Sequence, residues 1–290
     1  MKKIAIFCIV NLISLSLFAQ LPKHENDSIP GWKYSGAASL NFSQASLTNW
    51  AQGGESSISG LALMAGYADY RSKNSTWENA LEINYGLAQR GSEGVRKTDD
   101  QLSFSSQYGQ RASKEWYYSA AINFNTQMFD GFNYPNDSVK ISTFMAPAYL
   151  IASLGMEYDP NEDLSLILSP LTGKITFVLD DTLSNQGAFG VSPGDMVRTE
   201  LGAYFKGNYQ KEIIENVVFK TRLTLFSDYK HFLATVDVDW QTSLSMKIND
   251  HMSANILANL VYDNDIKFGT GGPRIQFKEV FGLGITYLVD

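Results

Sequence analysis

The sequence predicts an all-β fold, a transmembrane antiparallel up-and-down β-barrel of about 12 strands with both termini in the periplasm. Three observations lead to this prediction. Segments of roughly ten residues alternate between apolar and polar side chains with a period of two. Their connections alternate between short and long, as tight periplasmic turns and longer extracellular loops do. Aromatic residues are abundant, with 17 Phe, 15 Tyr and 5 Trp, and such rings favour strands and membrane interfaces.

The N-terminal segment has the pattern of a secretory signal peptide. Lys2 and Lys3 precede a mostly apolar run over 4–18, and Ala19 offers a small residue for cleavage. We therefore expect residues 1–19 to be a signal peptide, residues 20–31 a periplasmic N-terminal segment, and residues 32–290 the transmembrane barrel. The one cysteine, Cys8, would leave with the signal peptide, so thiol chemistry and disulfides are not expected.

Alternation places the strands. The predicted segment over 76–88 shows the pattern, with Trp77, Leu81 and Ile83 on one face and Glu78 and Glu82 on the other. The same pattern predicts strands over 32–43, 57–70, 76–88, 99–109, 116–128, 144–158, 164–178, 196–208, 217–228, 235–247, 252–262 and 275–289.

The connections give the orientation. Short turns are expected at 71–75, 110–115, 159–163 and 248–251, and longer loops at 44–56, 89–98, 129–143, 179–195 and 263–274. The connections 209–216 and 229–234 are similar in length, so the pattern is less clear there. In this arrangement several aromatic residues fall near the periplasmic rim, where an interfacial girdle is expected: Trp32, Tyr70, Trp77, Trp116, Tyr158, Tyr209 and Tyr287.

Charged residues on the predicted inward faces are the main candidates for a functional site. They are Arg198, Glu200, Lys206, Lys220, Arg222, Asp237 and Asp239. Opposite charges on neighbouring strands can form a structural ion-pair network. The same residues can instead line a constriction that selects solutes by charge. No direct feature of the sequence separates the two interpretations.

Other motifs carry weaker hypotheses. Gly173 and Lys174 resemble the end of a phosphate-binding loop, but the upstream glycine and the following Ser or Thr are missing. Pro170 within a strand instead indicates a bulge or a bend. Ser227, Asp228 and His231 are close in sequence and suggest a lipid hydrolase, although no nucleophile-elbow motif accompanies them.

No cofactor or metal is expected. The acidic pairs Asp180–Asp181 and Asp263 with Asp265 could attract Ca²⁺, but the second pair lacks the glycine and terminal glutamate of an EF-hand loop. Solvated turn residues are the simpler interpretation of both pairs. The formal net charge of −7 argues against a nucleic-acid partner bound through its phosphates.

Three segments resemble a known family. The sequence around Asn49, Trp50, Gly53 and Gly54, together with the segments 168–174 and 187–191, is similar to the domain of unknown function 3078 family of Bacteroidetes-lineage bacteria. The resemblance would cover most of the chain after the signal peptide. It implies an envelope protein of uncharacterised role and supplies no activity.

Together these features predict a non-enzymatic protein of the cell outer membrane that acts as a narrow channel or small-solute transporter. The alternative is a structural or assembly component whose extracellular loops bind a partner, with Asn49, Trp50, Gly53 and Gly54 as candidate surface residues. A lipid hydrolase is the third hypothesis. The expected partners are outer-membrane lipids, the barrel-assembly machinery during insertion, and a small solute or an envelope protein.

Overall fold

The computed structural model of the chain describes residues 30–47, 55–134, 136–231, 235–249, 252–266 and 272–289. The predicted signal peptide over 1–19 and nearly all of the predicted segment over 20–31 lie outside these residues, so both remain predictions.

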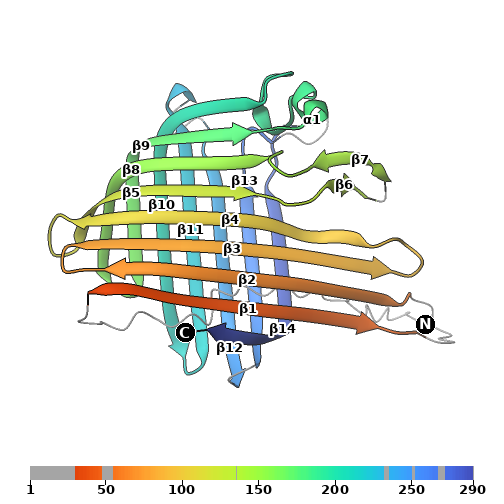
Figure 1. Ribbon diagram of the computed structural model, residues 1–290, viewed down its shortest axis with the longest axis horizontal. Coiled ribbons are helices and arrows are strands. Elements are labelled where there is room, and N and C mark those ends of the chain that lie inside the picture. The colour runs from red at the N-terminus through yellow and green to blue at the C-terminus, as the bar shows by residue number, and fades with distance from the viewer. Residues whose placement is uncertain are drawn as a thin grey trace, which may run out of the picture.

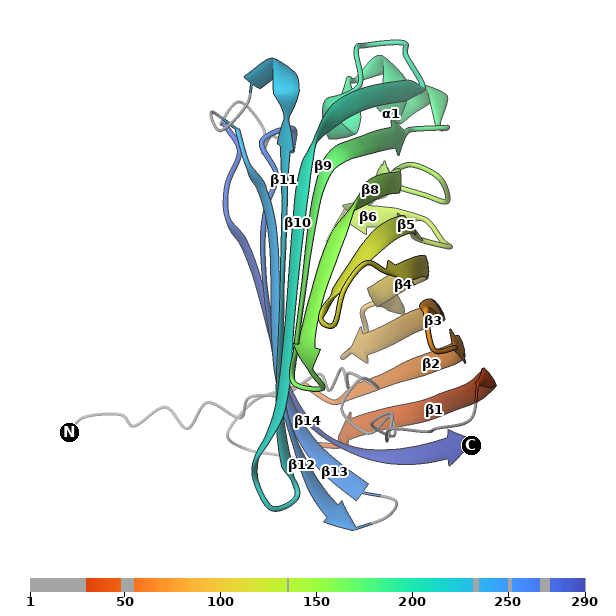
Figure 2. The same ribbon diagram turned by 90° about the vertical axis from the view of Figure 1, so that its left-hand side faces the viewer.

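Twelve strands form one closed antiparallel barrel, in which each strand pairs with its neighbour along the chain and β1 pairs with β14. The fold class predicted from the sequence is therefore confirmed. In Figure 1 the strands β1–β5 cross β10–β13 at a steep angle, because the two walls of the barrel are seen through one another. Figure 2 shows the same walls from the side, with the strands inclined as barrel closure requires.

The barrel strands are β1 (Gly31–Ala45), β2 (Ser57–Arg71), β3 (Ser75–Arg90), β4 (Arg96–Arg111), β5 (Trp116–Thr126), β8 (Ala148–Asn161), β9 (Leu164–Phe177), β10 (Val197–Ile214), β11 (Val217–Asp228), β12 (Asp237–Asn249), β13 (Met252–Tyr262) and β14 (Gln276–Val289). Each overlaps one predicted strand. The largest difference is β10, which continues to Ile214, so the prediction of a loop over 209–216 is wrong. A tight turn at Glu215 and Asn216 replaces it, with Asn216 in the left-handed region at a φ of 64°.

The longer connections carry structure of their own. The connection after β5 holds a small hairpin, β6 (Gly131–Asn133) and β7 (Asn136–Ser142). The connection after β9 holds the helix α1 (Asp181–Asn185) and the 3₁₀ turn η2 (Ala188–Gly190), and η3 (Tyr229–His231) follows β11. No helix in the described part of the chain is long and apolar enough to cross a bilayer.

The connection that contains α1 is fixed by a small core and by polar contacts. Ala146, Val178, Leu183 and Val191 form a buried cluster beneath α1. Asp180 caps the helix by accepting from the Leu183 N–H at 3.0 Å, and it also accepts a hydrogen bond from Lys140 on β7. That bond to Lys140 lowers the pKa of the Asp180 carboxyl and raises the pKa of the Lys140 ammonium group. The hairpin and the helix are thus joined outside the barrel strands.

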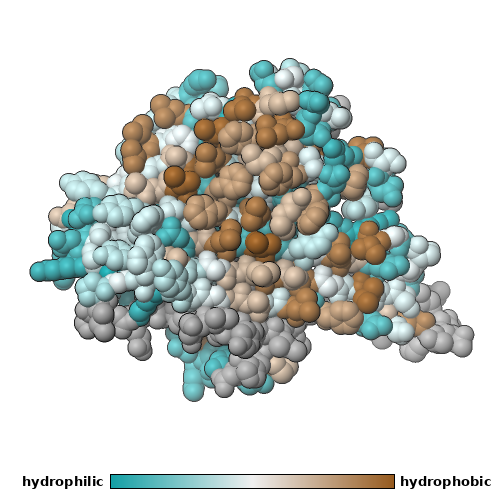
Figure 3. Space-filling view, viewed as in Figure 1, coloured by the Kyte–Doolittle hydropathy of each residue, from teal (hydrophilic) through white to brown (hydrophobic). Residues whose placement is uncertain are grey.

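The outer face of the barrel is apolar. Leu40 and Phe42 on β1 are 70% and 62% exposed, and similar side chains follow on most other strands. Figure 3 shows hydrophobic side chains gathered over the middle of the strands and hydrophilic ones toward their ends. A lipid bilayer provides the environment in which such a surface is stable.

An aromatic row crosses the outer face near one rim. The strand register aligns Trp32, Tyr70, Trp77 and Tyr108 across β1–β4. The Trp32 ring centroid lies 5.5 Å from that of Tyr70 and also 5.5 Å from that of Trp77. Farther round the barrel, the Trp116 and Tyr158 centroids are 4.8 Å apart. The side chain of Tyr287 lies outside the described part of the chain.

A bulge in β9 interrupts the register with both neighbouring strands, between Ser169 and Thr172 against β10 and between Leu168 and Leu171 against β8. This agrees with the bulge that Pro170 indicates. Glycines face the bulge on each side: a Cβ atom at Gly155 would meet the Leu168 carbonyl oxygen at 2.2 Å. Gly202 of β10 pairs with Thr172 at the bulge, and a Cβ atom at Gly202 would meet the Ser227 carbonyl oxygen of β11, on the other side, at 2.2 Å. The backbones therefore approach one another where side chains are missing.

Candidate functional site

The inward face of the barrel is polar and charged. The register aligns Lys206 of β10 with Thr224 of β11 and with Asp239 of β12. Because side chains alternate along a strand, the structure places all seven charged candidates on this inward face: Arg198, Glu200, Lys206, Lys220, Arg222, Asp237 and Asp239. They separate into a group near the end of β9 that leads to α1 and a group in the middle of the lumen.

The first group is an ion-pair network around Lys174 of β9. The Lys174 Nζ atom lies 2.6 Å from Asp237 Oδ2, 3.7 Å from Asp263 Oδ2 and 4.0 Å from Glu200 Oε2. Its side chain is only 7% exposed. The ammonium group also lies 5.4 Å from the ring centroid of Phe226, close enough for a cation–π interaction. A buried cation is tolerated here because three carboxylates surround it.

Arg198 extends the ion-pair network to two of the connections between barrel strands. Its guanidinium is 2.9 Å from Glu200 Oε1 and 2.6 Å from Asp265 Oδ2. It also donates a hydrogen bond of 3.3 Å to the Gly190 carbonyl oxygen. These contacts join β10 to the segment after β13 and to the η2 turn after α1.

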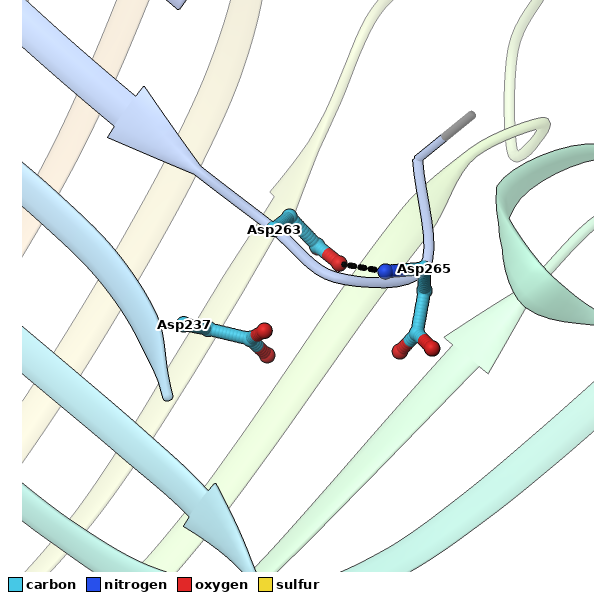
Figure 4. Close-up of side chains that lie close together, drawn as sticks. All are labelled: Asp237, Asp263 and Asp265. Atoms are coloured by element: carbon cyan, nitrogen blue, oxygen red, sulfur yellow. Dashed lines mark hydrogen bonds between the residues drawn. The ribbon is translucent and has the colours of Figure 1, made fainter. Parts of the chain in front are cut away.

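Three carboxylates of the network lie close together. Ligand atoms of Asp237, Asp263 and Asp265 are all within 4.8 Å of one another. In Figure 4, Asp237 is the first residue of β12, and the other two follow β13, where the Asp265 N–H donates to Asp263 Oδ1 at 2.8 Å. Burial raises the pKa of the Asp263 carboxyl, and the Lys174 ammonium group opposes that rise. Lys174 and Arg198 provide the counter-charges, so the structural interpretation of Arg198, Glu200 and Asp237 accounts for their positions.

Lys206, Arg222 and Asp239 of the second group line a cavity of about 370 Å³ in the lumen, which Lys174 and Asp237 of the network also line. Lys206 and Arg222 contribute cations, Glu82 and Asp239 carboxylates, and several amides complete the polar lining. Arg222 Nη2 donates to Gln241 Oε1 at 2.5 Å, and Tyr67 donates to Glu82 Oε1 at 3.3 Å. The ammonium group of Lys206 makes no hydrogen bond or short ion pair with any residue that the structure describes.

Two carboxylates of this lumen face its cations from the opposite wall, whereas Asp239 lies on the same wall as the cations. In the barrel order, β3 lies halfway round from β11. Glu78 and Glu82 project inward from β3, whereas Lys220 and Arg222 project from β11, beside Lys206 on β10. Opposed charges across a low-dielectric lumen produce a field directed from one wall to the other. Such a field acts on any charged or dipolar solute in the cavity.

Two residues of the lumen were missed as candidates by sequence reasoning. Lys174 was considered only as part of a phosphate-loop pattern, although it alternates with Thr172 and Thr176 on a polar face. Alternation places Glu82 on the polar face of its strand and does not distinguish it from Glu78 there. Their importance depends on partners from distant strands, which alternation within one strand does not indicate.

The hypothetical hydrolase residues lie at the end of β11 and in the η3 turn that follows it. His231 Nδ1 lies 3.5 Å from Asp228 Oδ2, but the Ser227 hydroxyl donates to the Thr235 carbonyl oxygen at 3.2 Å. Ser227 and Asp228 are successive residues of β11, so their side chains point to opposite faces. A serine nucleophile requires its base within hydrogen-bond reach. The predicted surface residues Asn49, Trp50, Gly53 and Gly54 lie outside the described residues.

Two family models match parts of the chain. Residues 42–132 match the model of a family described as protein of unknown function, DUF3078. Residues 178–277 match the model of a family described as protein of unknown function, DUF481. The predicted resemblance to the first family is confirmed over the matched residues. The match is shorter than predicted, because the segments 168–174 and 187–191 lie beyond it. No curated protein matches the chain in sequence.

Several solved structures are similar to the chain. The NanC porin is 11% identical with a TM-score of 0.42, over 87% of this chain and 98% of that chain. An outer-membrane channel from Pseudomonas putida F1 is 10% identical with a TM-score of 0.41, over 96% and 99% of the two chains. The translocator domain of the autotransporter NalP from Neisseria meningitidis is 10% identical with a TM-score of 0.37, over 91% and 90%.

Proposed function

We propose that this protein is an outer-membrane β-barrel that serves as a narrow channel or transporter for small polar solutes. The observation that carries the proposal is the polar cavity inside a closed barrel, with carboxylates on β3 facing cations on β10 and β11. A twelve-stranded barrel is intermediate between filled eight-stranded barrels and open sixteen-stranded porins. A narrow, selective path suits that size.

The outer surface supports the proposed location. Exposed apolar side chains on the strands and an aromatic row near one rim suit a bilayer with an interface at that depth. The proposed partners are therefore outer-membrane lipids and the small solute itself, with the barrel-assembly machinery required for insertion. A non-enzymatic role is part of the proposal, and it is supported by the Ser227 hydroxyl donating to the Thr235 carbonyl oxygen.

Single-channel conductance in a planar bilayer tests the proposal. We expect the purified, refolded barrel to give steady conductance with a measurable ion preference. Arg222→Glu and Asp239→Lys reverse charges that line the cavity, so each should shift the reversal potential in a salt gradient, in opposite directions. Lys114→Glu is the control, because Lys114 lies in a turn with its side chain 92% exposed. A folded barrel that never conducts contradicts the proposal.

A further inference from the structure

The cavity holds inward cations on β10 and β11 and hydrogen-bond acceptors on the neighbouring strands β12 and β13. Lys206 and Arg222 are near neighbours, because the register aligns Lys206 with Thr224, two residues from Arg222 on the same face. Two like charges at this distance repel one another. Among the described residues Lys206 makes no hydrogen bond and no ion pair within 4.0 Å, and Glu78, Glu82 and Glu157 attract it only from a longer distance. The pair is thus a site of positive charge directed into the cavity.

Unsatisfied acceptors lie on the next strands. The Oδ1 atoms of Asp239 on β12 and Asn259 on β13 are buried without a hydrogen-bond donor among the described residues, although the Asp239 carboxylate also has Gln241 as a hydrogen-bond partner. Both residues line the same cavity as Lys206 and Arg222. Gln241 pairs with Asn259, so Asp239 and Asn259 are diagonal neighbours on the inward face. A buried acceptor without a donor costs free energy unless a bound group supplies one.

The distance between the cations and the unsatisfied acceptors fits a short molecule. Lys206, Thr224 and Asp239 occupy one row across three strands, so the first and last backbones are about 10 Å apart. Side chains that extend into the lumen reduce the gap between their charged ends. The cavity volume of about 370 Å³ falls within the range of small-molecule sites.

From these observations we infer that the lumen holds a binding site for small zwitterions of amino-acid or dipeptide size. The solute carboxylate binds Lys206 and Arg222, and the solute ammonium group donates to Asp239 and Asn259. A simple anion can bind only to the cations Lys206 and Arg222, and a simple cation only to the acceptors Asp239 and Asn259. The inference rests on the proposed function, because it names the class of solute for that cavity.

Isothermal titration calorimetry on the detergent-solubilised full barrel tests this site without requiring conduction. Glycylglycine is the zwitterionic probe, N-acetylglycylglycine lacks the cationic end, and glycylglycinamide lacks the anionic end. We expect glycylglycine to bind at least about tenfold more tightly than either analogue, since each lost charge-assisted contact is worth about that factor. Equal affinity for the three probes, or no binding of glycylglycine, overturns the inference.

Two variants assign the halves of the site. Lys206→Gln should weaken glycylglycine and N-acetylglycylglycine by about tenfold and leave glycylglycinamide unchanged. Asp239→Asn should weaken glycylglycine and glycylglycinamide and leave N-acetylglycylglycine unchanged. Lys211→Gln is the matched control on the same strand, because Lys211 pairs with Asp163 at 3.8 Å near a turn. A uniform loss for all probes in either variant contradicts the assignment.

The two hypotheses fail in different ways. A barrel that conducts but does not bind glycylglycine retains the proposed channel and loses the zwitterion site. A barrel that binds glycylglycine with the expected pattern but never conducts retains the site and loses the channel.

Discussion

At the residue scale, Lys174 is the side chain on which most of the described ion pairs at its end of the lumen depend. It contacts Asp237, Asp263 and Glu200 and is almost fully buried. Lys174→Met leaves these carboxylates without their shared cation, and removal of one partner from a buried network costs about 3–5 kcal/mol. We expect a loss of that size in the free energy of unfolding, measured by urea titration in lipid vesicles.

Two further variants separate this effect from a general loss of charge. Lys114→Met removes the same charge from an exposed turn and should change stability by less than about 0.5 kcal/mol. In a Lys174→Met background, Asp237→Asn removes one uncompensated carboxylate and should recover part of the loss. Equal destabilisation by Lys174→Met and Lys114→Met would show that the network does not stabilise the fold.

At the element scale, each barrel strand could be located from the sequence because alternation of side chains is a local property. The limits of β2, β9 and β11 agree closely with the predicted segments. The β6–β7 hairpin and α1 were not predicted, since their short segments depend on contacts such as Lys140 with Asp180. The lumen charges were assigned to the correct face, but their partners come from strands far apart in the sequence. Alternation gives the face of a residue and does not give its neighbour across the barrel.

The bulge in β9 gives a prediction at the same scale. A Cβ atom at Gly155 would lie 2.2 Å from the Leu168 carbonyl oxygen and 2.6 Å from the Ser169 Cα atom. Gly155→Ala therefore forces backbone against backbone, and overpacking of this kind costs about 1–3 kcal/mol. We expect a lower urea midpoint in vesicles and a smaller folded fraction on an unboiled gel.

Gly173→Ala is the matched control for this prediction. Gly173 lies on β9 itself, and a Cβ atom there would have no heavy atom within 4 Å. The substitution should be neutral to within about 0.5 kcal/mol. If Gly155→Ala is as stable as Gly173→Ala, the close approach at the bulge does not constrain the sequence.

At the scale of the whole molecule, closure depends on the pairing of the first strand with the last. β1 pairs along its full length with β2, from Gly31 to Ala45. Among the described residues it pairs with β14 only over Gly36–Leu40, with Ile285–Val289. The pairing of β1 with β14 is the seam of the barrel. Because a shorter ladder has fewer hydrogen bonds to break, this seam should open before the other strand pairs separate. Local opening at the seam would then precede unfolding of the barrel.

A disulfide across the seam tests this order of opening. Ala38 is directly opposite Tyr287 on β14 and directly opposite Met64 on β2. Directly opposed residues of antiparallel strands lie within the Cα separation that a disulfide allows. The Ala38→Cys/Tyr287→Cys variant, once oxidised, should raise the temperature at which the unboiled barrel loses its compact gel mobility. Ala38→Cys/Met64→Cys places the same bond in the long β1–β2 ladder and should raise this temperature much less.

Apart from Cys8 the sequence has no cysteine, so the engineered pair reacts without competition in a barrel that lacks residues 1–19. An equal rise in both variants would mean that the barrel unfolds as one unit and that the β1–β14 seam is not its weak point.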